Sequence, residues 1–276
     1  MFYALALYSV FYRKRKEKIR LVNKKIIFRI MGQYFNNSDT PLRNSYVKRL
    51  KAQVSNSEGL WYVCQQLIKV KSIVVLPEKD IPLPIVSILG IDNLLENKLS
   101  SRNLHHRALA IQYSYELEIT ANYKKIHEFI NSSNIFVRRE AQLAMVVFMN
   151  WEILSFFAKL TYPISLWQQI RIIEKLKSSK KPIVTESLKS LLNSKNTDIL
   201  ELGMRLVVAF NVEREFNMIK SHTQHHNTKL ANAAFDMLVQ LNISKPYNKE
   251  QSFSKQTFEL PFSYVDYRNH KKNDKL

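Results

Sequence analysis

A repeating pattern of apolar residues runs through the second half of the chain. The first apolar residue of each segment is called position i. In five segments the apolar residues occupy positions i, i+4, i+7, i+8 and i+11, or part of that series, which places them on one stripe of an α-helix. The segments are aligned with Leu104, Val137, Leu166, Ile199 and Leu230 at position i. Successive starting points lie 33, 29, 33 and 31 residues apart. The pattern predicts five helices that recur at nearly regular intervals.

The residues around each stripe predict where these helices begin. Three places before i stand Ser101, Asn134, Asn196 and Asn227, with Pro163 in the third segment. Ser and Asn are favoured N-cap residues because a side-chain oxygen accepts a hydrogen bond from the first turn, and proline suits that turn because it lacks the N–H group. Four places after i, the small residues are Ala108, Ala141, Gly203 and Ala234. We expect a neighbouring helix to approach closely there.

Shorter apolar stripes between the five segments predict a second set of helices, at residues 119–130, 151–160, 183–192 and 212–219. The repeating unit is then helix, short polar turn, helix, and one such hairpin cannot bury its apolar face without a neighbour. The chain contains only 4 glycines, against an average usage of about 7%. This scarcity argues against glycine-rich phosphate loops and chains of tight β-hairpins. The sequence therefore predicts an all-α protein made of stacked helical hairpins.

The run Asn-Ile-Phe-Val-Arg-Arg-Glu-Ala at residues 134–141 resembles the start of the second helix of a HEAT repeat, in which a polar cap, a Val-Arg pair and a small residue recur. Residues 196–203 and 227–234 look like weaker copies, without the arginine. The resemblance covers residues 101–241 and implies HEAT-like hairpins stacked into a right-handed α-α superhelix, or solenoid. The family's proline and regular turn aspartate are not evident, so armadillo-like and other helical-repeat subtypes stay open.

The regions on either side of the array leave alternatives open. Residues 36–100 are helical in pattern, apart from three prolines in the stretch 76–84, and form either degenerate repeats or an N-terminal cap. Residues 242–276 carry six aromatic residues among polar ones. These aromatics either cover the exposed face of the last repeat, as a terminal cap must, or form a short peptide that binds a partner.

The N-terminus combines an uncharged apolar segment, residues 1–12, with a basic stretch, residues 13–35. Twelve residues are too few to cross a bilayer, which needs about twenty, and positive charge after the apolar run is the wrong order for a cleavable signal peptide. The segment is either a membrane anchor whose beginning is missing, an apolar stub held on anionic lipid, or an ordinary first helix. Predicted membrane-surface residues are Arg13, Lys14, Arg15, Lys16, Lys18 and Arg20. Membrane attachment would leave the rest of the chain on the cytoplasmic side, and a soluble cytoplasmic protein is the alternative.

The distribution of charge bears on the class of partner. The net charge is +19, of which the first sixty residues hold +10, from 13 Lys/Arg and 3 Asp/Glu. Residues 134–241 hold only +5, from 14 Lys/Arg and 9 Asp/Glu. A surface that follows a phosphate backbone needs a concentrated basic face. This distribution favours a protein over a nucleic acid as the partner of the repeats.

The order of apolar N-terminus, basic stretch and repeats also resembles small bacterial membrane-anchored HEAT-repeat proteins. That resemblance implies a non-catalytic scaffold, without a cofactor, that binds another protein which the sequence does not identify. Exposed residues of the second helices would contact that partner. The predicted partner-binding residues are Arg138, Arg139 and Arg205. Trp167 lies in the same region, but we expect it in the core.

A nucleic-acid-binding protein is the alternative, because some DNA glycosylases that act on alkylated purines are built from HEAT-like repeats. Trp151, Glu152, Trp167 and Arg171 keep this alternative open. The chain carries no HExxH, GxSxG or Walker A motif. We therefore predict no catalytic residue.

Histidines and the single cysteine fit structural roles better than chemical ones. His222, His225 and His226 fall in a turn with no acidic or cysteine partner close in sequence, so a solvated turn is favoured over a metal site. Cys64 lies in an apolar stretch and is expected in the core rather than at a reactive site. No metal ligand is predicted.

Overall fold

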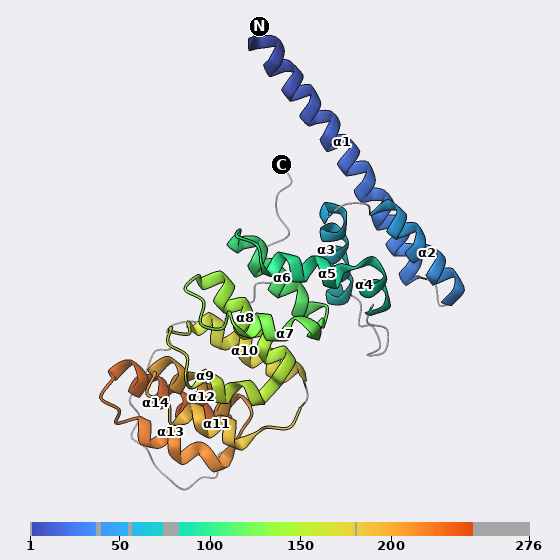
Figure 1. The fold of residues 1–276 in the computed structure, drawn as a ribbon. Coiled ribbons are helices and arrows are strands. Elements are labelled where there is room, and N and C mark those ends of the chain that lie inside the picture. The colour runs from blue at the N-terminus through green and yellow to red at the C-terminus, as the bar shows by residue number, and fades with distance from the viewer. Residues whose placement is uncertain (1, 37–39, 55–56, 74–82, 180, 245–276) are drawn as a thin grey trace, which may run out of the picture.

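Every element of the protein is helical over the residues that the structure describes (Figure 1). This computed structural model describes residues 2–36, 40–54, 57–73, 83–179 and 181–244. The α-helices are α1 (Phe2–Phe35), α2 (Thr40–Gln53), α3 (Ser57–Ile73), α4 (Leu83–Leu89), α5 (Ile91–Leu99), α6 (Leu104–Glu116), α7 (Tyr123–His127), α8 (Ile135–Met149), α9 (Leu154–Phe157), α10 (Leu166–Ser179), α11 (Thr185–Leu192), α12 (Thr197–Ala209), α13 (Phe216–His222) and α14 (Thr228–Ser244). Short 3-10 helices are η1 (Thr120–Asn122), η2 (Asn150–Ile153) and η3 (Glu213–Glu215). The all-α prediction is confirmed for these residues. The aromatic residues predicted to form a cap or a peptide, at 247–267, lie outside them.

Helix α1 continues through both the apolar segment and the basic stretch of the N-terminus. Its buried side chains Ile27, Ile30 and Met31 lie in the half against which α2 packs. The other half extends away from the rest of the molecule (Figure 1). Of the residues described, none belongs to a helix long and apolar enough to cross a membrane.

Helices α6, α8, α10, α12 and α14 form a row in which each contacts the next (Figure 1). Shorter helices pair with members of the row: α5 contacts α6, α7 contacts α8, α11 contacts α12 and α13 contacts α14. The row corresponds to the five striped segments, and α7, α9, α11 and α13 fall within or close to the predicted second set. The predicted helix positions are therefore confirmed, although η1, η2 and η3 replace the first turns of three of the shorter helices.

The helix caps of the row follow one constant spacing. They are Asn103, Asn134, Ser165, Asn196 and Asn227, each 31 residues after the one before. For α6 the predicted cap, Ser101, is wrong. The side-chain oxygen of Asn103 instead accepts hydrogen bonds from the N–H groups of His105 and His106, at 3.0 and 3.2 Å. Position i of the first segment is therefore His106 rather than Leu104.

The alignment of α10 needs the same correction. Pro163 was predicted at the capping position, but that position belongs to Ser165, whose Oγ accepts a hydrogen bond from the N–H of Gln168 at 3.4 Å. Position i of this segment becomes Gln168 in place of Leu166. With both corrections, all five repeats have the same length.

Two buried glutamines explain why the stripe of α10 was misaligned. Gln168 and Gln169 are buried, whereas Leu166 is 50% exposed. The Nε2 of Gln168 donates to the carbonyl oxygen of Arg139 in α8 at 2.8 Å, and the Nε2 of Gln169 donates to that of Asp198 in α12 at 3.2 Å. Buried amides are tolerated when they are hydrogen-bonded. The glutamines thus connect α10 to its neighbours on both sides, at positions where an apolar stripe predicts leucine or valine.

Close helix packing at the small positions is confirmed for Gly203 in α12. A Cβ atom built on Gly203 would lie 3.0 Å from the Cβ of Leu191 and 3.2 Å from the backbone nitrogen of Leu192, both in α11. The backbone nitrogen cannot rotate away as a side chain can. The absence of a side chain at Gly203 therefore lets the two helices of this hairpin approach.

The substitution Gly203→Ala is expected to lower the free energy of unfolding by about 1 kcal/mol. Alanine favours a helix over glycine by about 1 kcal/mol, but overpacking in a filled interior costs about 1–3 kcal/mol, and the rigid neighbours make the second effect larger. Gly32→Ala in α1 is the matched control, because its Cβ would have no heavy atom within 4 Å. It should be neutral or stabilising. Urea unfolding of both variants measures the difference, and an equal gain in both would contradict the close approach.

Candidate functional site

Large apolar side chains are exposed on the first turns of three neighbouring helices. They are Leu104, Ile135, Phe136, Leu166 and Trp167, which we call the first-turn ridge. In the corrected alignment they occupy positions i−2 and i−1. At 3.6 residues per turn, position i−2 points nearly opposite to position i, which is buried in α8 and in α10. Five apolar side chains are therefore displayed on α6, α8 and α10, outside the buried stripe.

The expectation that Trp167 is a core residue is wrong. Trp167 is 65% exposed, and Phe136, its equivalent one repeat earlier, is 67% exposed. Leu166 was aligned with the buried stripe because the buried residues in the first turn of α10, Gln168 and Gln169, are polar. Once Gln168 takes the core position, Trp167 has to face outward. The sequence reasoning missed the ridge for this reason, and the 31-residue spacing of the caps was the signal that could have revealed it.

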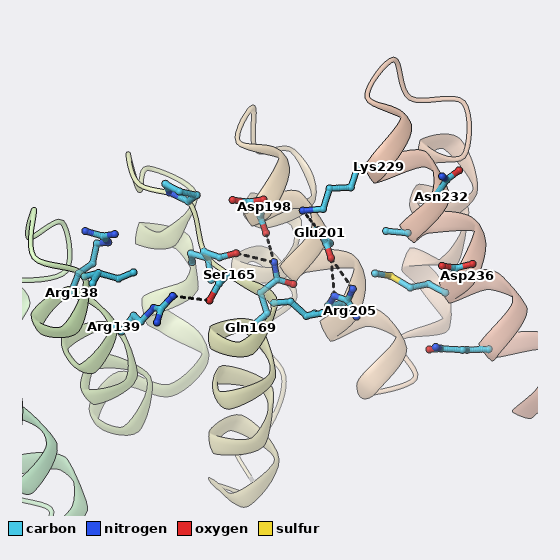
Figure 2. Close-up of a pocket in the computed structure, with 17 residues that line it drawn as sticks. Arg138, Arg139, Ser165, Gln169, Asp198, Glu201, Arg205, Lys229, Asn232 and Asp236 are labelled. Carbon is cyan, nitrogen blue, oxygen red and sulfur yellow. Dashed lines mark hydrogen bonds and ion pairs between the residues drawn. The ribbon is translucent and has the colours of Figure 1, made fainter. Parts of the chain in front are cut away.

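Two hollows flank the ridge. The larger, of about 630 Å³, lies along α8, α10, α12 and α14, from the first turns of α8 and α10 to the middle of α12 and α14 (Figure 2). The smaller, of about 420 Å³, lies between α6, α8 and α10. Ile135 and Leu166 line the larger hollow, whereas Phe136 and Trp167 line the smaller one. Arg139 lines both, so it stands at the centre of the face.

Arg138 makes its polar contacts within the protein. It is 7% exposed, and its Nη1 donates to the carbonyl oxygens of Ser132 and Ser133 at 2.6 and 3.2 Å. Its guanidinium carbon lies 4.2 Å from the centre of the Tyr162 ring. Arg107 repeats the pattern 31 residues earlier, with Nη2 donating to the carbonyl oxygen of Ser101 at 2.7 Å. These contacts hold the turn before each helix, and little of Arg138 is left for a partner.

Arg139 and Arg205 are the other predicted partner-binding residues. Arg139 lies at one end of the larger hollow, and Arg205 lies nearer its middle, between Gln169 and Asp236 (Figure 2). Arg139 donates to the Oγ of Ser165 at 3.2 Å. Arg205 forms an ion pair with Glu201 at 2.7 Å, and Lys229 lies 3.9 Å from the same carboxylate. The guanidinium charge of Arg205 is thus compensated inside the protein. Partner binding by any of the three arginines stays a prediction.

A polar network forms one wall of the smaller hollow. Glu140 accepts a hydrogen bond from the hydroxyl of Tyr115 at 2.8 Å and forms an ion pair with Arg171 at 2.9 Å. Burial is the main cause that raises the pKa of Tyr115, and the nearby Glu140 carboxylate adds to it. The hydroxyl therefore stays protonated and donates. Lys175 pairs with Glu116 at 2.9 Å next to this network. Each carboxylate has a cation, so the wall presents little free charge.

The predicted membrane-surface residues all belong to α1. The side chain of Lys14 is exposed. The side chains of Arg13, Arg15, Lys16, Lys18 and Arg20 lie outside the described residues. Farther along the helix, Leu21, Val22 and Phe28 are exposed. Basic and apolar side chains are therefore exposed together on this helix.

Histidine and cysteine side chains were predicted to have structural roles. His222 ends α13, and the ring centroids of His225 and His226, in the following turn, are 4.1 Å apart. Burial lowers the pKa of His222, and the neighbouring His225 lowers it further. Across the described ranges, no group of three His, Cys, Asp or Glu side chains could hold a metal ion.

Cys64 is buried in α3, so its prediction as a core residue is confirmed.

The site is therefore a surface rather than an enclosed pocket. It consists of the first-turn ridge, the two hollows and Arg139 at their shared edge. Arg138 and Arg171 support it from within. In comparisons with known proteins, no family model and no curated protein matches this chain.

Proposed function

We propose that the protein is a non-catalytic scaffold that binds another protein along the first-turn ridge. The observation that supports it most is the exposure of Phe136 and Trp167 on adjacent helices. Contiguous apolar surface on a folded protein marks interaction sites, and aromatic side chains together with arginine dominate the energy of protein interfaces. Phe136, Trp167 and Arg139 are a set of this kind. No bond-making chemistry is required of the site.

The proposed architecture is a right-handed α-α superhelix of HEAT-like hairpins. It is supported by the constant 31-residue spacing of the caps and by the contacts that link α6, α8, α10, α12 and α14 in order. In such an array one helix of every hairpin lines a common surface. The ridge occupies the first turns of three of those helices.

We also propose that α1 holds the scaffold at the cytoplasmic face of a membrane. Lysine or arginine near an anionic bilayer contributes about 1 kcal/mol each, and α1 carries Lys14, Lys24, Lys25 and Arg29 besides the residues named above. The exposed Phe28 could insert among the headgroups. Binding of the full chain to anionic but not neutral lipid vesicles, weakened by salt, supports this part of the proposal.

A nucleic-acid partner is less well supported than a protein. Of the residues that kept this alternative open, Trp167 and Arg171 line the smaller hollow, whereas Trp151 is buried and Glu152 does not line that hollow. However, the ion pair with Glu140 compensates the charge of Arg171. A phosphate chain that continued along the larger hollow beyond Arg139 would be repelled by Asp198, Glu201 and Asp236, which line it.

Site-specific photo-crosslinking of the full chain in its native cells tests the proposed function. A benzophenone amino acid replaces Trp167 in one variant and, as a control, the exposed Phe156 of α9 in another. We expect a discrete protein adduct from position 167 that is absent from position 156. Adducts that disappear with nuclease, or equal labelling at both positions, would contradict the proposal.

A further inference from the structure

The centre of the first-turn ridge carries positive charge that the protein itself does not compensate. Arg139 has the neutral hydroxyl of Ser165 as its hydrogen-bond partner. Among the ion pairs between described residues, none includes Arg138 or Arg139. Arg171 and Arg205, by contrast, each pair with a carboxylate. The guanidinium of Arg139 is therefore left without a carboxylate where the two hollows meet, and that of the buried Arg138 has none either.

The surroundings of these arginines make the uncompensated charge more effective. Burial is the main cause that lowers the pKa of Arg138; the nearby Tyr162 opposes this shift, and the charge of Arg139 adds to it. An approaching anion would relieve this repulsion. Arg139 also lies between apolar walls, because Phe136 and Trp167 line the smaller hollow with it. Low-dielectric walls strengthen an ion pair that forms among them.

The smaller hollow is suited to an apolar side chain. At about 420 Å³ it falls in the size range of ligand-binding clefts, roughly 300–1,000 Å³. Leu104, Ala108 and Leu109 line it from α6, opposite Phe136 and Trp167. Its ionic residues Glu140 and Arg171 neutralise each other. A large aliphatic or aromatic side chain placed there would lose water without separating any charge from its partner.

We propose that the segment recognised by the ridge is an acidic, apolar peptide of the partner protein. One carboxylate of this peptide pairs with Arg139, and a neighbouring leucine, phenylalanine or tryptophan enters the smaller hollow against Phe136 and Trp167. The inference rests on the proposed function and specifies its partner chemistry. A basic peptide would meet the repulsion of Arg139. A polyphosphate chain needs several free cations in line, whereas the next cations, Arg171 and Arg205, are already paired.

Selection from a phage-displayed library of random dodecapeptides on the immobilised full chain tests this inference. We expect the enriched sequences to hold aspartate or glutamate within a few residues of leucine, phenylalanine or tryptophan. For one synthetic peptide from that set, Phe136→Ala and Trp167→Ala should each weaken binding about tenfold or more, as truncation of an interface hot spot does. Circular dichroism checks that both variants remain folded.

Charge reversal gives a readout that misfolding cannot imitate. Arg139→Glu should weaken binding of the selected peptide about tenfold or more, and it should gain affinity for the same peptide with its acidic residue changed to lysine. Arg214→Glu, an exposed arginine in η3 far along the chain, is the matched control and should change neither. Gain of affinity by the reversed pair supports a direct contact between the peptide and Arg139.

The outcomes separate this inference from the proposed function. Enrichment of basic or uncharged peptides whose binding still depends on Trp167 would overturn the acidic partner and leave protein binding at the ridge intact. Enriched peptides that bind equally well to Trp167→Ala and Phe136→Ala would overturn both. An absence of enriched sequences would also overturn the inference, while the crosslinking experiment still decides the proposed function.

Discussion

Trp151→Ala is expected to lower the free energy of unfolding by about 3–5 kcal/mol, the range found when a buried aromatic side chain is truncated. Trp151 is 1% exposed, and its ring meets that of Phe210 edge to face, with centroids 4.8 Å apart. It lies in η2, which contacts α8, α9, α10 and α11. Removal of the ring would leave a cavity shared by consecutive hairpins. Urea unfolding followed by circular dichroism measures the loss.

Trp167→Ala is the matched control, because it removes the same side chain from the surface. A change within about 0.5 kcal/mol is expected there, as for most surface substitutions. Trp151→Phe should lose less than Trp151→Ala, since it keeps a ring and removes an indole N–H that has no hydrogen-bond partner among the described residues. If the hairpins fold independently, Trp151→Ala would instead split the transition in two. A single transition at lower urea is the result that a shared core requires.

Helix positions followed from the sequence because the apolar stripe is a property of each segment alone. In four of the five segments the sequence places apolar residues at i+4 and beyond. In the structure, an Asn or Ser cap marks the start of each helix of the row. The exact register did not follow where polar residues replace the stripe. Gln168 is buried only because the carbonyl oxygen of Arg139, in another repeat, accepts its hydrogen bond. A partner 29 residues away is not visible in a local pattern.

The candidate site was predicted in part and for a different reason than the structure provides. Arginines of the second helices were selected because they were expected to be exposed and because arginine is a frequent anchor of protein interfaces, and Arg139 does line both hollows. Arg138 is buried because the carbonyl oxygen of Ser132 and the ring of Tyr162 satisfy its guanidinium. Apolar side chains at i−2 and i−1 were the informative signal. Burial in the core does not explain an apolar residue outside the buried stripe. In a helical repeat, such positions are therefore the first candidates for a binding surface.

Cys64 is expected to react with a disulfide reagent about a thousandfold more slowly in the native protein than in urea at pH 8. Burial raises the pKa of this thiol from its ordinary value of 9.0 to about 12. The thiolate is the reactive form, and its fraction falls about tenfold for each unit of pKa. Because the side chain of Cys64 is buried, the reagent is also excluded from it sterically, which slows the reaction further. The measurement is the rate of thionitrobenzoate release with and without denaturant.

The same shift predicts how stability depends on pH. Because the folded pKa lies above the unfolded one, the folded state holds its proton longer, and the contribution of Cys64 is fully present below about pH 9. It is lost as the pH rises toward about 12, at roughly 1.4 kcal/mol per pH unit. Cys64→Ala removes this part of the alkaline loss, while the raised pKa of Tyr115 leaves a loss of the same sign in both proteins. Urea unfolding at pH 8 and pH 10.5 gives the difference between the two chains. An equal loss in both, together with rapid labelling of the native thiol, would mean that α3 opens locally and that Cys64 does not belong to the cooperative core.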